Sequence, residues 1–137
     1  MEFRIESWGI ENYHFVHAFD KDDNCLSTVS IELDCGEYPR YKNLCNGKKI
    51  AKIVRVETNP HYVGNGIASE LLRHTIITFK EYNIVLLCEP QHRCEGTDTL
   101  KTITDLKKFY SKFGFRKTGE LLPTMIRKAS LSASGEQ

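Results

Sequence analysis

The segment with the most direct chemical meaning is HYVGNGIASELL, residues 61–72, in which Gly64 and Gly66 directly precede a helical pattern. A helix N-terminus exposes unpaired N–H groups and the positive end of the helix dipole. Where side chains are absent from the entry loop, an anion such as a phosphate can lie directly on these amides. A plain turn that needs only glycine's backbone freedom explains the same residues. The segment alone leaves both interpretations open.

Two common phosphate-binding motifs do not fit this segment. A dinucleotide fingerprint requires a third glycine where Ser69 stands, and here four predicted strands precede the motif. A P-loop would end in Gly-Lys-Ser/Thr, and this loop does not. The wider sequence must therefore decide what the two glycines are for.

Composition limits the classes of function. The 137 residues favour one domain, and 40% hydrophobic with 27% charged residues is typical of a globular protein. A formal net charge of +1 argues against a nucleic-acid partner held by bulk charge. We expect no membrane span and no signal peptide, because no apolar run reaches roughly 18–20 residues and the N-terminus lacks a basic-then-apolar pattern. The cysteines at 25, 35, 45, 88 and 94 form no CxxC pair, so we expect reduced thiols, no metal and a cytoplasmic location.

The elements that must position the glycine loop follow from hydrophobic periodicity. Alternation and β-branched residues predict strands, three- to four-residue spacing predicts helices, and Gly, Pro and Asn mark turns. Strands are expected at 2–8, 13–20, 25–34, 50–59 and 83–90, with one or two closing strands within 115–129. Helices are expected at 67–79 and 100–113. A turn is expected at 9–12, and loops are expected at 36–49 and 91–99. The order β-β-β-β-α-β-α-β(-β) predicts a single α+β domain over residues 1–129 with a mixed β-sheet. In its central βαβ unit, strands 50–58 and 84–89 are expected to be parallel neighbours, and residues 130–137 form a tail expected to be disordered.

Two motifs and a closing strand, in the family's order along the chain, resemble the GNAT superfamily of N-acetyltransferases. The segment IVRVETNPHYVGNGIASELL, residues 53–72, resembles the family's acetyl-CoA-binding core, with a valine-containing strand followed by an Arg/Gln-x-x-Gly-x-Gly/Ala loop that opens a helix. Farther on, LKKFYSKFGF resembles the family's Phe-Tyr-x-x-x-Gly-Phe segment, and LLPTMIRK resembles its last strand. His61 stands where the family usually has Arg or Gln, and no helical pair precedes the fourth strand. The resemblance implies a small GNAT-like fold with splayed parallel strands and helices on both faces.

The resemblance also implies acetyl transfer from acetyl-CoA to a primary amine through a tetrahedral intermediate. By the family pattern the backbone N–H of Val54 stabilises the thioester oxygen, in a gap between strands that a β-bulge helps to open, and Tyr110 protonates the leaving thiolate. The residues implied in cofactor binding are Val54, Arg55, Val56, His61, Tyr62, Val63, Gly64, Asn65, Gly66, Ile67, Ala68 and Tyr110.

The base that deprotonates the amine is not assigned by any motif. Glu89 and Glu57 end the two strands expected to splay, and His61 and His92 are weaker candidates. The identity of the acceptor is also open. The candidates are a small amine, a protein lysine or N-terminus, and aminoacyl-tRNA. A catalytically silent acyl-CoA-binding regulatory module is the alternative, although the presence of Tyr110 favours an active enzyme. Assembly as a homodimer is left open.

Overall fold

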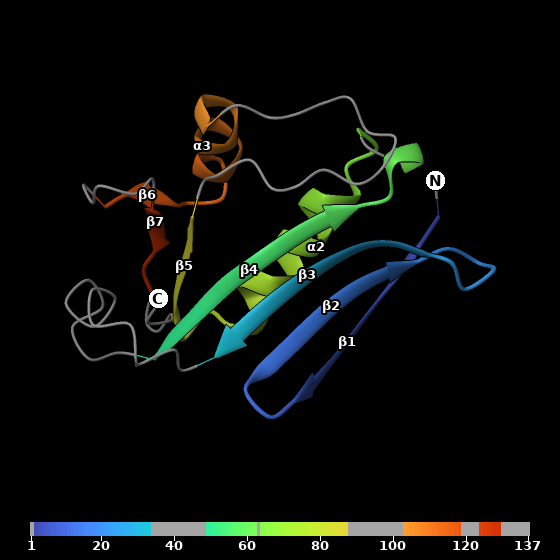
Figure 1. Cartoon of the computed structure of the whole chain (residues 1–137), viewed down its shortest axis with the longest axis horizontal. Helices are drawn as coiled ribbons and strands as arrows, with labels where there is room; N and C mark the ends of the chain where they lie inside the picture. The colour runs from blue at the N-terminus through green and yellow to red at the C-terminus, as the bar shows by residue number, and fades with distance from the viewer. Residues whose placement is uncertain (1, 34–48, 63, 88–102, 119–123, 130–137) are drawn as a thin grey trace, which may run out of the picture.

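The computed structural model describes residues 2–33, 49–62, 64–87, 103–118 and 124–129. These residues form one seven-stranded sheet in the order β1-β2-β3-β4-β5-β7-β6, with two α-helices (Figure 1). The elements in chain order are β1 (Arg4–Ile10), β2 (Tyr13–Phe19), β3 (Cys25–Leu33), β4 (Ile50–Thr58), the 3₁₀ turn η1 (Pro60–Tyr62), α2 (Ile67–Thr78), β5 (Asn83–Leu87), α3 (Ile103–Ser111), β6 (Arg116–Lys117) and β7 (Thr124–Arg127). The predicted α+β order and mixed sheet are confirmed, because β4 and β5 are parallel and the other pairs are antiparallel. The expected loop at 91–99, the tail at 130–137 and most of the loop at 36–49 lie outside the described residues.

The first hairpin corrects one expectation. We expected a turn at 9–12, but Gly9 and Ile10 belong to β1 and pair with His14 and Tyr13. The turn consists only of Glu11 and Asn12, because Glu11 adopts the left-handed conformation (φ 54°) that a two-residue hairpin accepts. The first two strands are therefore joined directly, without a helical pair between them.

The core lies between one face of the sheet and α2, which passes behind β3 and β4 in Figure 1. The helix expected at 67–79 from its three- to four-residue apolar spacing buries one stripe, with Ile67, Leu71, Leu72 and Thr75 all at most 1% exposed. The side chain of Thr75 bonds the carbonyl of Leu71, so its hydroxyl is not left unpaired in the core. From β2 and β3 the core receives Val16, Ala18, Val29 and Ile31.

The second helix joins the same core. Tyr110 of α3 and Phe115 beyond it belong to the buried cluster that contains Leu71 of α2. We expected helices on both faces of the sheet; within the described residues, both helices contribute to this one cluster. No described helix covers the opposite face of β1 and β2, where Trp8 and Tyr13 are 49% and 45% exposed.

Candidate functional site

The two parallel strands separate partway along their length. Pairing between β4 and β5 covers only Ile50↔Asn83, Ala51↔Ile84 and Lys52↔Val85. Strand β4 continues to Thr58 and β5 to Leu87, while β7 pairs with β5 along its other edge. Because alternate backbone groups of a strand point to opposite sides, the second half of β4 presents N–H and C=O groups that no described strand pairs on the β5 side. The predicted splay of the parallel strands is therefore present.

A β-bulge lies where the strands part. In the β3–β4 register Ser30 pairs with Arg55 while Ile31 pairs with Ile53, so Val54 is the extra residue of β4. A bulge bends and twists the strand that carries it, which directs β4 away from β5. Val54 is 44% exposed, whereas Ile53 before it is 5% exposed. The bulge falls on the residue whose backbone N–H was expected to contact the thioester.

The N-terminus of α2 has no side-chain cap. Its N-cap is Gly66, in a left-handed conformation with φ 79°, and the first helical hydrogen bond runs from the Glu70 N–H to the Gly66 carbonyl at 3.1 Å. The amides of residues 67–69 precede that bond, so they have no acceptor within the helix. Gly64 has φ 92°, and a methyl group added at either glycine would meet no atom of the described residues within 4 Å, chain neighbours aside. The left-handed backbone conformation thus explains why glycine occurs at both positions, and the space beside their amides is open.

The loop before these glycines is built by Asn59. Its side-chain oxygen accepts the His61 N–H at 3.0 Å and its carbonyl accepts the Tyr62 N–H at 2.8 Å, which forms η1. Tyr62 packs its half-buried ring against the core, whereas the His61 side chain is exposed. Asn65, Ile67 and Ala68 lie with the glycines at the start of α2, and Val63 is outside the described residues.

Tyr110 is in the core rather than on the surface of α3. It is 8% exposed and its ring contacts those of Phe109 and Phe115 at centroid distances of 5.2 and 5.8 Å. Its carbonyl accepts N–H groups from Phe113 and Phe115, which closes the helix beside Gly114 at φ 93°. The buried cluster that contains Tyr110 also includes Leu86 of β5.

Of the two candidate bases, only Glu57 lies in the described residues. It is near the end of β4 and its carboxylate is 3.2 Å from the Arg55 guanidinium, with both side chains about half exposed at 43% and 51%. The Ser27 hydroxyl donates to the Glu57 carbonyl at 2.6 Å, which ties the end of β4 to β3. Glu89 and His92 lie outside the described residues, as does the part of the chain directly after β5.

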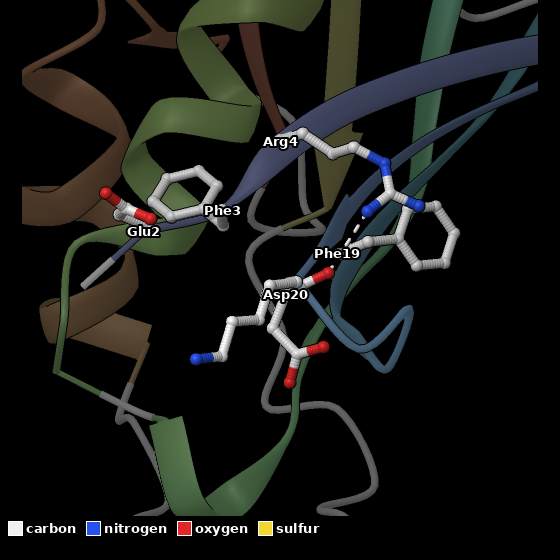
Figure 2. A pocket seen from close by; sticks show the side chains of 6 residues that line it. Glu2, Phe3, Arg4, Phe19 and Asp20 are labelled. Atoms are coloured by element: carbon white, nitrogen blue, oxygen red, sulfur yellow. Dashed lines mark hydrogen bonds between the residues drawn. The ribbon is translucent and has the colours of Figure 1, made fainter.

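A separate hollow of about 420 Å³ is formed at the start of β1 and the β2–β3 turn, and Figure 2 shows its lining. Arg4 donates to the Asp20 carbonyl at 3.1 Å and its guanidinium lies 5.0 Å from the centre of the Phe19 ring. Glu2, Phe3 and Lys21 complete the lining, and none of the residues predicted from the sequence belongs to it. We regard the parting strands as the better candidate site, because they combine an unpaired strand edge with a bare helix N-terminus.

Two features are absent from the described part of the chain. No group of three or more His, Cys, Asp or Glu side chains there could hold a metal ion. Neither described helix has the length and hydropathy needed to cross a bilayer. Cys25, the cysteine within the described residues, is exposed and forms no disulfide with another described residue.

The sequence reasoning gave no role to a hydrogen-bonded group on β1–β3. The indole N–H of Trp8 donates to Nε2 of His17 at 2.9 Å, and Nδ1 of His17 lies 2.9 Å from the Thr28 hydroxyl. The strand register pairs His17 with Thr28 and sets Trp8 diagonally across from His17, so the three side chains share one face of the sheet. The alternation of residues along the first two strands was the available signal, and it does not reveal which side chains become neighbours.

Comparison with known proteins identifies the fold. No protein-family model matches the sequence, and a search of the curated proteins gives no match either. Solved structures do match. A Corynebacterium glutamicum protein described as histone acetyltransferase HPA2 and related acetyltransferase matches with a TM-score of 0.64, 16% identity, and coverage of 89% of this chain and 67% of that one. A GNAT-family acetyltransferase from Staphylococcus aureus matches at 0.57 and 20%, covering 87% and 69%.

Arabidopsis thaliana NAA60, solved with acetyl-CoA, matches with a TM-score of 0.60 and 11% identity over 85% of this chain and 74% of that one. A further match at 12% identity is the KacTA–DNA complex. The chain thus spans about two thirds to three quarters of the length of these structures. The strand order, the parting of β4 from β5 and these structural matches agree: the chain has the fold of the GNAT acetyltransferases.

Proposed function

We propose that this protein is an N-acetyltransferase that transfers the acetyl group of acetyl-CoA to a primary amine. The observation that carries the proposal is the gap between β4 and β5, which opens beside the bulge at Val54 and shares its end of the sheet with the bare N-terminus of α2. A thioester on a long flexible arm suits such a gap, because the arm can pair with an exposed strand edge as an added strand would. The neighbours solved with acetyl-CoA and with coenzyme A support this choice of acyl donor.

The first chemical task is to hold the acyl donor. In this proposal the pantetheine arm pairs with backbone groups of Val54 and Val56, on the side of β4 that β5 leaves unpaired. The amides from Tyr62 to Ala68 were expected to hold the pyrophosphate, but the N–H groups of Tyr62 and Asn65 already donate to backbone carbonyls. The pyrophosphate is therefore proposed to lie on the amides of Gly64 and of residues 66–68, where the open space beside the two glycines admits it. Both contacts use the backbone, so binding of the acyl donor requires few of the side chains in the family pattern.

The second task is to stabilise charge during the attack. The thioester oxygen becomes negative in the tetrahedral intermediate, and a fixed N–H donor there typically contributes ~10²–10³ in rate. The Val54 N–H is the proposed donor, since the bulge sets this residue apart from the regular β3–β4 ladder. The departing thiolate then takes a proton, and Tyr110 is the proposed acid because it is nearly buried in the core cluster that also contains Leu86 of β5.

The third task is to remove a proton from the attacking amine, since only the neutral amine is a nucleophile. Glu57 is the proposed base among the described residues. Its Arg55 partner is a half-exposed surface contact, so the carboxylate can exchange that partner for an amine or a bridging water. Glu89 remains the alternative base, as expected from the sequence.

A silent acyl-CoA-binding module is the competing function, and one pair of measurements separates the two. Calorimetric titration with acetyl-CoA tests the cofactor, and release of the CoA thiol in the presence of a panel of small amines and short peptides tests transfer. An enzyme both binds acetyl-CoA and releases CoA with at least one amine. Binding without release from every amine would favour the silent module, and the absence of binding would reject both.

A further inference from the structure

One face of the β1–β2 hairpin carries large apolar side chains that the core does not use. Trp8, Ile10 and Tyr13 are 49%, 58% and 45% exposed, while Val16 and Ala18 on the other face of β2 are fully buried. The strand register sets Trp8 opposite Phe15 and Ile10 opposite Tyr13, so these four residues form one patch. We call them the hairpin patch. Clustering of this kind is uncommon on a surface that contacts only water.

Trp8 is held in place within the patch. Its ring lies 4.7 Å from that of Phe15, and its indole N–H donates to Nε2 of His17. Because an indole N–H can only donate, Nε2 of His17 carries no proton, and the ring's own N–H on Nδ1 points to Thr28. A half-exposed tryptophan that is already ordered loses little freedom when a partner covers it, which is the property of an interface anchor.

The hairpin patch is continuous with the proposed active site. One row of paired residues crosses the four strands from β1 to β4. It consists of Trp8, Phe15, Ser30 and Arg55, each paired with the next. Arg55 adjoins the bulged residue Val54. Three steps between strands of about 4.8 Å each put the patch about 14 Å from the bulge, a span that roughly four residues of extended polypeptide cover.

The charges on this face do not attract a phosphate backbone. Arg4 pairs with Glu6 at 2.7 Å and Arg55 with Glu57 at 3.2 Å. Farther along the β3–β4 register Lys52 lies opposite Glu32, so this cation is also matched by a carboxylate. Binding of nucleic acid requires unneutralised cations for its phosphates. A neutral face with an ordered aromatic anchor fits a polypeptide instead.

We propose that the hairpin patch and the row from Trp8 to Arg55 form the docking surface for a polypeptide acceptor, which places a large apolar side chain on Trp8 about four residues from the amine that is acetylated. This proposal rests on the proposed function and narrows its acceptor from any primary amine to an amine of a polypeptide. The amine belongs either to the polypeptide's N-terminus or to a lysine side chain.

The test uses two series of short peptides built from Ser, Gly and Ala, each with one Phe at successive distances from the amine. One series has a free N-terminus and no Lys; the other has a blocked N-terminus and one Lys. In at least one series, kcat/KM for CoA release should peak when Phe lies about four residues from the amine. The series that shows the peak identifies the source of the amine. A flat dependence in both series would overturn the proposal.

Trp8→Ala tests the anchor itself. It should lower the peak about tenfold, mainly by raising KM, because the lost contact is with a part of the substrate remote from the reacting atoms. Ile77→Ala is the matched control, since Ile77 is 70% exposed on α2 and outside the patch; its kcat/KM should equal that of the wild type. A peak that survives Trp8→Ala would refute the anchor. If Trp8→Ala does not fold, Tyr13→Ser replaces it, with the same expected direction.

Binding without turnover gives an independent reading. Trp8 is the chain's one tryptophan, so fluorescence of the wild-type protein should change when the best Phe peptide is added and stay constant with its Phe→Ser analogue. A stable dimer in light scattering, with Trp8 fluorescence that depends on protein concentration, would assign the patch to a second copy and overturn the proposal. Acceptance of aminoacyl-tRNA in preference to every peptide would also overturn it. Failure of acetyl-CoA to bind in calorimetry would instead reject the proposed function.

Discussion

Replacing Gly64 by Ala separates a ligand role for this glycine from its conformational role. Gly64 has φ 92°, where an L-residue is strained by roughly 1–2 kcal/mol. Since an added methyl group meets no atom of the described residues within 4 Å, chain neighbours aside, backbone strain is the main cost to the folded protein. We expect the free energy of unfolding to fall by about 1 kcal/mol, which lowers Tm by about 4 °C in a domain of this size.

Binding of CoA should fall by more than this strain explains. The added methyl group occupies the open space in which the pyrophosphate is proposed to lie against the amides. We expect the Kd for CoA to rise at least tenfold, equivalent to about 1.4 kcal/mol or more of lost binding free energy. The fold remains, so the loss appears in the calorimetric affinity and not as an unfolded sample.

Gly114→Ala is a matched control for the backbone strain. Gly114 has φ 93°, almost the same conformation, but it follows α3. Its added methyl group would lie 3.2 Å from Nε of Arg127, which donates to the Phe113 carbonyl at 2.9 Å. We expect a similar or slightly larger loss of Tm and an unchanged Kd for CoA. If Gly64→Ala bound CoA as the wild type does, or if both variants lost affinity equally, the proposed amide cradle would be wrong.

Three further predictions test other parts of the site. Tyr110→Phe keeps the ring packing in the core and should lower kcat at least tenfold with unchanged acetyl-CoA affinity; an unchanged kcat would remove Tyr110 from the mechanism. Glu57→Gln should shift or abolish the acidic limb of the pH–rate profile, and an unshifted limb would exclude Glu57 as the base. Burial lowers the pKa of His17 below its usual 6.5, so the native state binds protons less readily than the unfolded chain, and stability present above pH 6.5 should be lost as the pH falls through the lowered pKa. Protonation also removes the acceptor of the Trp8 N–H, so tryptophan fluorescence should change over the same acidic range, and His17→Gln should lack that change.

Local patterns predicted most of the secondary structure. The strand expected at 50–59 is β4 (Ile50–Thr58) and the helix expected at 67–79 is α2 (Ile67–Thr78). Such elements are readable because side-chain periodicity is a local property of a strand or a helix. The first turn was expected two residues too early, since the glycine pattern suggested Gly9 whereas Glu11 takes the left-handed conformation. The helix expected at 100–113 is described over Ile103–Ser111.

The candidate site was predicted in part for a similar reason. The glycine loop is a contiguous motif, so its position at the start of α2 followed from the sequence. The expected bulge and splay followed from the family resemblance, and no periodicity in IAKIVRVET marks Val54 as the extra residue. That residue is defined by β3, because Ser30 and Ile31 pair on either side of it.

The amino-acid sequence by itself determined the order of the elements, the buried stripe of α2 and the bare amides at its start, because these depend on residues close together in the chain. Tertiary structure alone decided where β4 leaves β5, and that Trp8, His17 and Thr28 become neighbours on an open face that leads to that gap. Strand register couples residues that are far apart in sequence, and a shift of one residue would send each of these side chains to the other face of the sheet.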